Sequence, residues 1–537
     1  MRWKNLTCLG PDSSVTKGIS QVKLSHARPV RGAVFDEPNL LAAAGLVPMV
    51  ALADRVGLQD LADQILTVPT DKGANAGLKV TSVVAGMVAG ADSIDDMAIL
   101  RHGGMRRVFD ACYAPSTLGS FLRKFSFGHV RQLDAVASRT LIRLAQQAPL
   151  LPGIDDYALA DMDDSIIEVH GYAKQGAGFG YTKVRGLNSF IGTVSTPQAA
   201  PVIVAQRLRK GSAGSARGAA RLVADTLATV HRLRSTGATG PVLLRADSAF
   251  YGHKVVAAAR RAKAVVSITV RQTRHIKAAI STIGDDAWTT IKYPTAVFDE
   301  PSGRWISRAE VAEIPFVAFK SRKNSEQVPG RLVVRRIPDL NPKAVAGQPT
   351  LFDTWRFHAF FTTSTLDTVT ADKTHRGHAI IEQVHADLKD SALAHLPSKS
   401  FAANSAWLVL AVVAFNLTRA AAALSGPRLA KATTGTIRRT LIVVPARIAG
   451  SARTLTLHLP TGWPWQNSWD ELFTHTCGPD DAHPSSPELL IGIPHLVAMS
   501  TLAGRGSDGP AEVVRAGVVI AQPVGVAGDV DDHGSVQ

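Results

Sequence analysis

Three acidic residues lie where their carboxylates could act together. Asp163 follows an apolar strand expected over residues 157–162, and Asp247 follows a second apolar strand expected over residues 242–244. Glu382 lies in the segment HAIIEQVHADLK, whose apolar spacing predicts a helix. Because ligands gather at the carboxyl ends of strands in α/β sheets, we expect Asp163 and Asp247 to meet at one edge of a sheet.

Three carboxylates at one point suit the cleavage of a phosphodiester. Two Mg²⁺ ions about 4 Å apart can serve both the attacking and the leaving oxygen of an in-line displacement. Mg²⁺ is a hard ion that prefers oxygen ligands, and Mn²⁺ can substitute for it. Without a metal the carboxylates would repel one another. We therefore predict that Asp163, Asp247 and Glu382 are both catalytic and metal-binding.

The choice of Asp163 has two neighbouring alternatives. Strand alternation puts Asp161 and Asp163 on one face and Asp164 on the other. Asp163 is preferred because the strand is expected to end there, with Ser165 at a turn. An Asp at a strand end is more often a turn or helix cap, so residue type and spacing alone leave the three open.

The elements that would position these residues follow from hydrophobic periodicity. Strands alternate with helices over 153–276, which predicts an α/β domain, and a β-rich stretch follows over 277–362. Helical periodicity returns over 363–428. A helical domain is expected over 35–152, either as a DNA-binding unit or as a bundle with a solvated basic face.

The two ends of the chain read differently. Residues 1–34 are polar and irregular, which predicts a flexible N-terminus, and 429–477 form a small C-terminal appendix with strands and a Trp-rich turn. Residues 478–537 are rich in Pro, Gly, Ser and Asp and are expected to be disordered. This last segment carries eight acidic residues against two Arg.

Charge and composition narrow the partners. The net charge is +15 at pH 7 and the pI is near 9.9, which favours a polyanionic partner such as nucleic acid. Cys8, Cys112 and Cys477 form no CxxC pair, which argues against a zinc site or disulfide framework. The most apolar stretch, 406–417, falls short of the ~20 residues of a membrane span, so we expect a buried helix and a cytoplasmic protein without a membrane partner.

Three longer stretches carry a family resemblance. They are ADMDDSIIEVHGYAKQGAGFGYTKVRGLNSFIGTV, RADSAFYGHKVV and HRGHAIIEQVHADLKDSALAHLPSKSFAANSAWLVLAVVAFNLTRA. Together they resemble the DDE transposases of bacterial insertion sequences, specifically the insertion-sequence 1380 type. The similarity spans roughly residues 35–469.

The resemblance implies an architecture and an activity. It implies a ribonuclease-H-like catalytic core with a β-rich insertion between the second and third acidic residues, Asp247 and Glu382. It also implies metal-dependent cleavage of double-stranded DNA at the terminal inverted repeats, and strand transfer into target DNA. A homodimer on DNA, in the nucleoid of a bacterial cytoplasm, is expected. A nuclease on the same core and a catalytically inactive DNA-binding relative remain alternatives.

The surroundings of the glutamate depart from a signature of related enzymes, Tyr-x2-Arg-x3-Glu-x6-Lys. Glu382 and Lys389 fit it, whereas His375 and His378 stand at the Tyr and Arg positions. Arg376, between the two histidines, or a histidine itself is expected to contact the phosphates.

Basic and aromatic residues complete the expected DNA surface. Phosphate contacts of this kind would be independent of sequence, although each cluster could equally be a solvated face. The predicted DNA-binding residues are Lys183, Arg185, Arg271, Arg274, Arg376, His378 and Lys389. Trp288, Trp305 and Trp355 could stack on a displaced base, although core tryptophans of the β-rich stretch are the commoner case.

Overall fold

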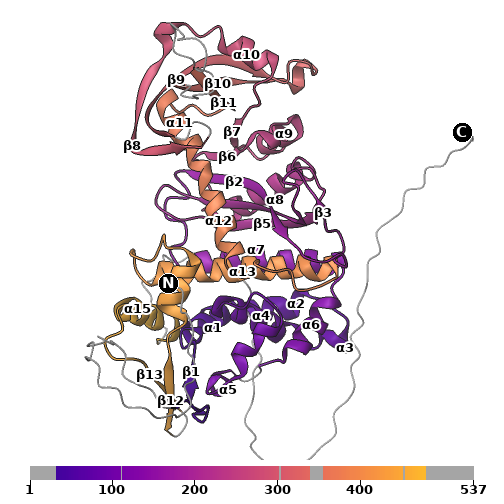
Figure 1. Cartoon of the computed structure of the whole chain (residues 1–537), viewed down its shortest axis with the longest axis vertical. Helices are drawn as coiled ribbons and strands as arrows, with labels where there is room; N and C mark the ends of the chain where they lie inside the picture. The colour runs from indigo at the N-terminus through magenta and orange to yellow at the C-terminus, as the bar shows by residue number, and fades with distance from the viewer. Residues whose placement is uncertain (1–31, 110–111, 301–303, 339–354, 452–453, 479–537) are drawn as a thin grey trace, which may run out of the picture. The chain divides into compact units, whose positions relative to one another are not determined.

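A computed structural model describes residues 32–109, 112–300, 304–338, 355–451 and 454–478. These residues form an α/β protein with one ten-stranded sheet and one three-stranded sheet (Figure 1). The flexible N-terminus expected over 1–34 lies outside the described residues except for its last three. The disordered tail expected over 478–537 also lies outside them, except for Gly478.

Five strands make the part of the large sheet that holds the carboxylates. They are β2 (Ala158–Glu168), β4 (Arg185–Ser195), β5 (Val202–Lys210), β6 (Val242–Ala246) and β7 (Val265–Thr269). Their order is β5-β4-β2-β6-β7; β4 is antiparallel to its two neighbours, whereas β2, β6 and β7 are parallel. The helices α8 (Ala219–Leu233) and α9 (His253–Arg261) supply the crossovers that lead into β6 and β7.

The expected end of the first strand was wrong. β2 does not stop at Asp163 and turn at Ser165 but continues to Glu168, because its second half stays paired with β4 from Asp164↔Phe190 to Glu168↔Gly186. Polar side chains are tolerated there since this half of β2 is only partly buried. Asp163 is therefore held in the middle of a long strand.

The β-rich stretch extends the same sheet. It contains β8 (Thr289–Asp299), β9 (Arg304–Ala318), β10 (Val328–Pro338) and β11 (Trp355–Thr362), preceded by α10 (Arg274–Ile280). β11 pairs antiparallel with β7 through three residue pairs, from Phe360↔Thr269 to Thr362↔Ser267. The inserted strands are thus continuous with the core by backbone hydrogen bonds.

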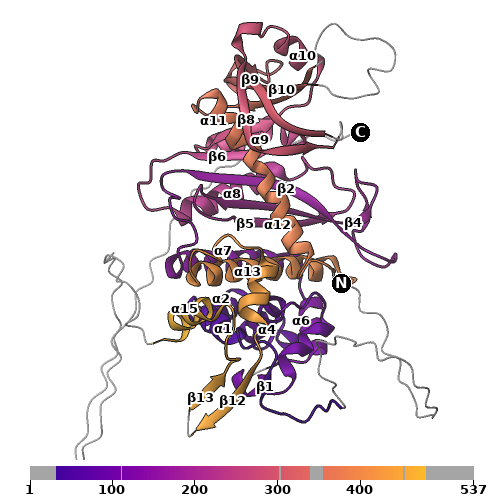
Figure 2. The ribbon, with the colours of Figure 1, turned by 60° about the vertical axis from the view of Figure 1, so that its left-hand side comes forward.

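Three helices follow the insertion. They are α11 (Thr368–Arg376), α12 (Ile380–Lys389) and α13 (Phe401–Leu424). α13 and α7 (Phe127–Gln147) form a layer between the sheet and the N-terminal helices (Figure 2). By length and composition α13 could cross a membrane, but 94% of its most apolar window is buried inside the protein. The burial expected for the stretch 406–417 is confirmed.

The helical region expected over 35–152 and the C-terminal appendix pack together. The N-terminal helices are α1 (Leu46–Arg55), α2 (Leu58–Ile65), α3 (Thr70–Gly73), α4 (Ala76–Ala89), α5 (Met105–Val108) and α6 (Pro115–Arg123). The short β1 (Leu40–Leu41) pairs with β12 (Ala446–Ser451), which pairs with β13 (Thr454–His458). α14 (Thr434–Ile437) precedes these strands, and α15 (Gln466–Cys477) contacts α1 and α13.

Candidate active site

Asp163 and Asp247 lie side by side because of the parallel register of β2 and β6. The last paired residues are Met162 of β2 and Ala246 of β6, and each aspartate is the next residue after its strand's last pair. Neighbouring strands lie about 4.8 Å apart, so the two carboxylates share one edge of the site. Asp247 caps a short 3-10 turn, η2 (Ser248–Phe250), where its Oδ1 accepts from the Ala249 amide at 2.9 Å.

Both carboxyl groups resist ionisation. Burial, followed by the negative charge of Asp247, raises the pKa of Asp163 to about 7. Desolvation also raises the pKa of Asp247, while His378 acts in the opposite direction on both groups. A pair of adjacent acids with raised pKa values is the environment in which a bound cation favours the ionised form of both.

The three aspartates of β2 differ in their partners. Asp161 is fully buried, and its two carboxylate oxygens accept hydrogen bonds from Arg245 Nε at 2.7 Å and Nη2 at 2.6 Å. Burial alone would raise the pKa of Asp161, but the charges and hydrogen bonds of Arg245 and His378 together outweigh it and the pKa is lowered. Asp164, on the other face, pairs with Arg209 at 2.7 Å. Asp163 has only a distant ion-pair neighbour among the described residues, His385, at 3.9 Å.

One face of α12 runs along β2. Glu382, His385 and Lys389 are spaced by three and four residues, which aligns them on a single face of α12, and His378 lies four residues before Glu382 in the 3-10 turn η5 (Gly377–Ala379) that leads into the helix. Three of them meet alternate residues of β2: His378 Nδ1 lies 2.8 Å from Asp161 Oδ1, His385 Nε2 3.9 Å from Asp163 Oδ2, and Lys389 Nζ 2.6 Å from Ser165 Oγ. Glu382 occupies the intervening position on this face, with its side chain exposed.

The donor set fits a hard cation, although no assembled metal cluster is present. Within the described ranges, no group of three or more His, Cys, Asp or Glu side chains is arranged to hold an ion. Asp163 and Asp247 nonetheless offer adjacent carboxylate oxygens, which Mg²⁺ prefers. His385 Nε2 is buried beside Asp163 without a hydrogen-bond partner. Glu382 offers a third, exposed carboxylate on the face of α12 that runs along β2.

The two histidines at the signature positions have different surroundings. His375 stacks on Phe360 with ring centroids 4.0 Å apart, and its ring nitrogens lie 2.8 Å from Ser267 Oγ and 3.0 Å from Thr269 Oγ1. Burial lowers the pKa of His375 to about 3, so the ring is neutral and anchors α11 to β7. His378 instead faces the carboxylates.

Arg376 turns away from the carboxylates. Its Nε donates to Asp372 at 2.8 Å, and its guanidinium lies 4.9 Å from the centre of the Tyr293 ring, in β8. Of the two residues expected to replace the signature arginine, His378 is therefore the one beside the site.

The remaining predicted DNA-binding residues fall into two places. Arg271 and Arg274 are both exposed, and the charge of Arg271 lowers the pKa of the Asp247 carboxyl. Lys183 and Arg185 lie beyond the far end of β2, where β3 (Gly178–Phe179) pairs with β4. Lys389, at the end of α12, lies 2.6 Å from Ser165 Oγ through its Nζ, and the charge of Asp163 acts on its pKa.

The tryptophans of the β-rich insertion make different side-chain contacts. The guanidinium of Arg336 lies 4.2 Å from the ring centre of Trp288 and 4.4 Å from that of Trp355. Trp305 is exposed and packs edge-on against Phe298.

Comparison with known families agrees with this geometry. The family model described as transposase DDE domain group 1 matches residues 23–476. The chain belongs to this family. Membership supports a transposase function, exerted on DNA. No curated protein matches the chain.

Two features of the transposase were missed from its sequence. One is the ion pair between Asp161 and Arg245, whose partners are 84 positions apart. The other is His385, three residues after Glu382, beside Asp163. The spacing of the two histidines and Lys389 around Glu382 was a usable signal, because three- and four-residue steps put side chains on one face of a helix.

Proposed function

We propose that this transposase cuts DNA at the ends of an insertion sequence and joins the freed strand to target DNA, with Asp163, Asp247 and Glu382 as its catalytic carboxylates. The observation that carries the proposal is the parallel register that sets Asp163 beside Asp247. The face of α12 that holds Glu382 lies along the same strand. We further propose that the enzyme is of the insertion-sequence 1380 type.

The strand arrangement supports a ribonuclease-H-like core. An antiparallel run, β5-β4-β2, is followed by two parallel strands, β6 and β7, with a helix before each of them. The insertion leaves this core after β7 and returns before α11. It therefore falls between the second and third proposed carboxylates, as the resemblance implies.

The proposed site would take two Mg²⁺ ions, or Mn²⁺, on Asp163, Asp247 and Glu382. When bound, the ions would polarise the phosphodiester and stabilise the leaving 3′-oxygen. The chain itself contributes positioning: β2 and β6 fix two of the acids on a rigid sheet. Partial burial of Asp163 keeps bulk water from screening the charges there.

Cationic side chains beside the acids would receive the DNA backbone. Lys389 lies along α12 at Ser165, and the imidazole of His378 is fixed by Asp161. Arg271 is exposed and its charge acts on the carboxyl of Asp247, and Arg274 is exposed at the start of α10. We assign phosphate binding near the cut to these four residues. Arg376 would reach the phosphates near the cut only by leaving Asp372, so we place its DNA contact on the side of the insertion. Double-stranded DNA held by a homodimer is the proposed assembly.

The test uses the full chain and an oligonucleotide duplex that carries the terminal repeats of the element. Asp163→Asn, Asp247→Asn and Glu382→Gln should each lower cleavage more than about 100-fold, since even outer-shell changes cost 10–100-fold. Glu168→Gln, an exposed acid at the end of the same strand, is the matched control and should leave cleavage unchanged. Joined product in Mg²⁺ supports the proposal; cleavage without joining indicates a nuclease, and binding alone indicates an inactive relative.

A further inference from the structure

The connection between β2 and β4 exposes three large aromatic rings. Tyr172 is 93% exposed, Phe179 65% and Tyr181 102%. Residues 169–184, which include β3, make up this segment, and we call it the β3 connection. Isolated exposed apolar residues are common, but three aromatic rings on one short connection indicate a contact surface.

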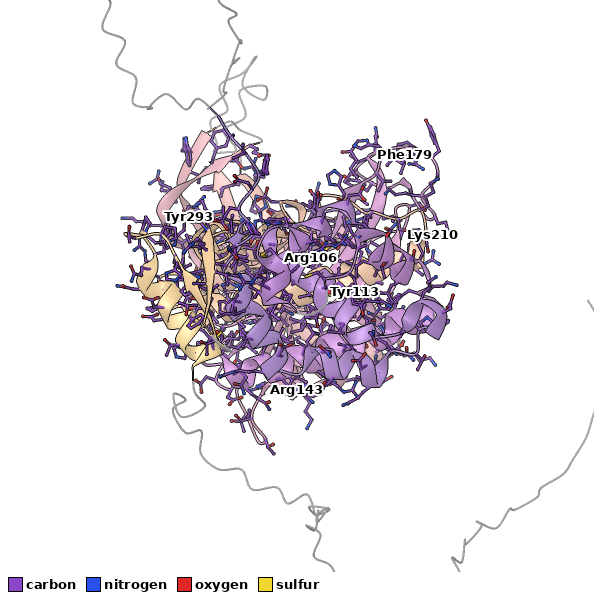
Figure 3. All side chains as sticks on the ribbon, turned by 90° about the horizontal axis from the view of Figure 1, so that it is seen from below. Arg106, Tyr113, Arg143, Phe179, Lys210 and Tyr293 are labelled. Atoms are coloured by element: carbon purple, nitrogen blue, oxygen red, sulfur yellow. The ribbon has the colours of Figure 1, made fainter. Side chains whose placement is uncertain are left out.

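Its charge is of one sign. The chain has no Asp or Glu between Glu168 and Asp225. Lys183 and Lys210 are exposed, and the guanidinium of Arg185 lies 5.1 Å from the centre of the Tyr172 ring. Figure 3 labels Phe179 and Lys210 at the same corner of the molecule. Cationic and aromatic side chains therefore alternate on this corner.

The base of the β3 connection is fixed. The Gln175 amide donates to the Lys399 carbonyl at 2.9 Å, and its side-chain carbonyl accepts from the Phe401 amide at 3.1 Å. Gly176 has a φ of +80°, and a Cβ there would meet the Phe401 ring at 2.8 Å. Because the base is already ordered, the rings can bind with little loss of conformational entropy.

The partner that fits this surface is DNA. Exposed lysines suit phosphates, and exposed aromatic rings suit the faces of bases. We propose that the β3 connection binds the DNA end beside the cut. Phe179 and Tyr181 would separate neighbouring bases and stack on them. Lys183 and Lys210 would contact the flanking phosphates. The inference rests on the proposed function only in taking DNA to reach Asp163.

The fold also sets where along the DNA this contact falls. From Asp163 to Glu168, β2 spans five residues, or about 17 Å at ~3.3 Å per residue. That length equals about five base pairs at ~3.4 Å each. The unstacked step should therefore lie about five or more base pairs from the cut, where aromatic wedges would bend the duplex.

The experiment measures base unstacking without catalysis. The full-length protein, in buffer with a chelator, is mixed with terminal-repeat duplexes that carry 2-aminopurine at single positions three to ten base pairs from the cut. Fluorescence should rise at a position about five or more pairs away. Phe179→Ala/Tyr181→Ala should abolish the rise and weaken binding about ten-fold or more. Phe127→Ala, which removes a 76% exposed ring at the start of α7, is the control and should change neither.

Further variants separate the two kinds of contact. Lys183→Ala/Lys210→Ala should weaken binding to every duplex and flatten its salt dependence, while the fluorescence rise persists at saturating protein. Asp163→Asn should leave both DNA binding and the fluorescence rise unchanged. A failure of the proposed cleavage chemistry can therefore be told apart from a failure of this DNA contact. If the folded double aromatic variant, with an unchanged melting temperature, still gives the full rise in fluorescence, the proposal is overturned. Normal DNA binding with loss of self-association would assign the surface to protein contact and overturns it as well.

Discussion

The buried pair of Asp161 and Arg245 allows a quantitative test of how the site is positioned. Asp161 is 0% exposed and Arg245 2%. Asp161→Ala would leave a buried guanidinium without its carboxylate, and breaking such a pair typically costs about 3–5 kcal/mol. That is a large part of the ~5–15 kcal/mol by which a domain is stable. Chemical denaturation of the full chain should show this loss directly.

The double variant Asp161→Leu/Arg245→Met separates stability from positioning. Replacing both partners by apolar residues is often neutral, so the free energy of unfolding should return to within about 2 kcal/mol of the parent. Cleavage should not return, because His378 loses its acceptor and the Thr374 carbonyl loses the Arg245 Nη1 donor at 2.6 Å. The expected loss is about 10–100-fold, as for other outer-shell partners.

Cleavage rates of both variants, measured across Mg²⁺ concentrations, decide between the explanations. A double variant that is as unstable as Asp161→Ala would mean that the pair is not desolvated as its burial indicates. A double variant that is stable and fully active would refute the idea that the pair positions His378.

Four other predictions have defined outcomes. Because the pKa of Asp163 is raised to about 7 when folded, ionisation of Asp163 should cost the metal-free protein stability as pH rises from about 4 to 7, and Asp163→Asn should remove this contribution from the denaturation curves. Mg²⁺ affinity, followed by calorimetry, should strengthen over the same range, since the ion displaces a proton. Gly377→Ala places a methyl 2.8 Å from Arg245 Nη1 and should slow cleavage, whereas Gly435→Ala, with nothing nearer than 3.5 Å, should not. Asn416→Leu removes both side-chain bonds from α13 to the β5 backbone and should cost about 1–3 kcal/mol by thermal melting.

The local elements could be read from the sequence because their periodicity is local. The strands around Asp247 and the helix around Glu382 lie close to where apolar spacing predicted them. The end of β2 was misjudged because a cluster of polar residues resembles a turn. Its pairing with β4 instead carries those residues through a strand.

Long-range partners could not be read in the same way. Arg245 faces Asp161 only because the parallel register of β2 and β6 makes them a pair, and nothing in either segment alone sets that register. The union of the insertion with the core sheet is of the same kind, since it depends on three pairs between β11 and β7. His375 was taken as a possible phosphate contact because its stacking on Phe360 is a tertiary feature.

The seam between β11 and β7 makes the insertion a poor candidate for a swinging arm. Displacing it by more than the length of a hydrogen bond would unzip the three pairs that join it to β7. β7 pairs directly with β6, the strand that leads into Asp247. A displacement of the inserted strands would therefore twist the sheet and shift Asp247, because no flexible linker separates the insertion from β7 where β11 pairs with it.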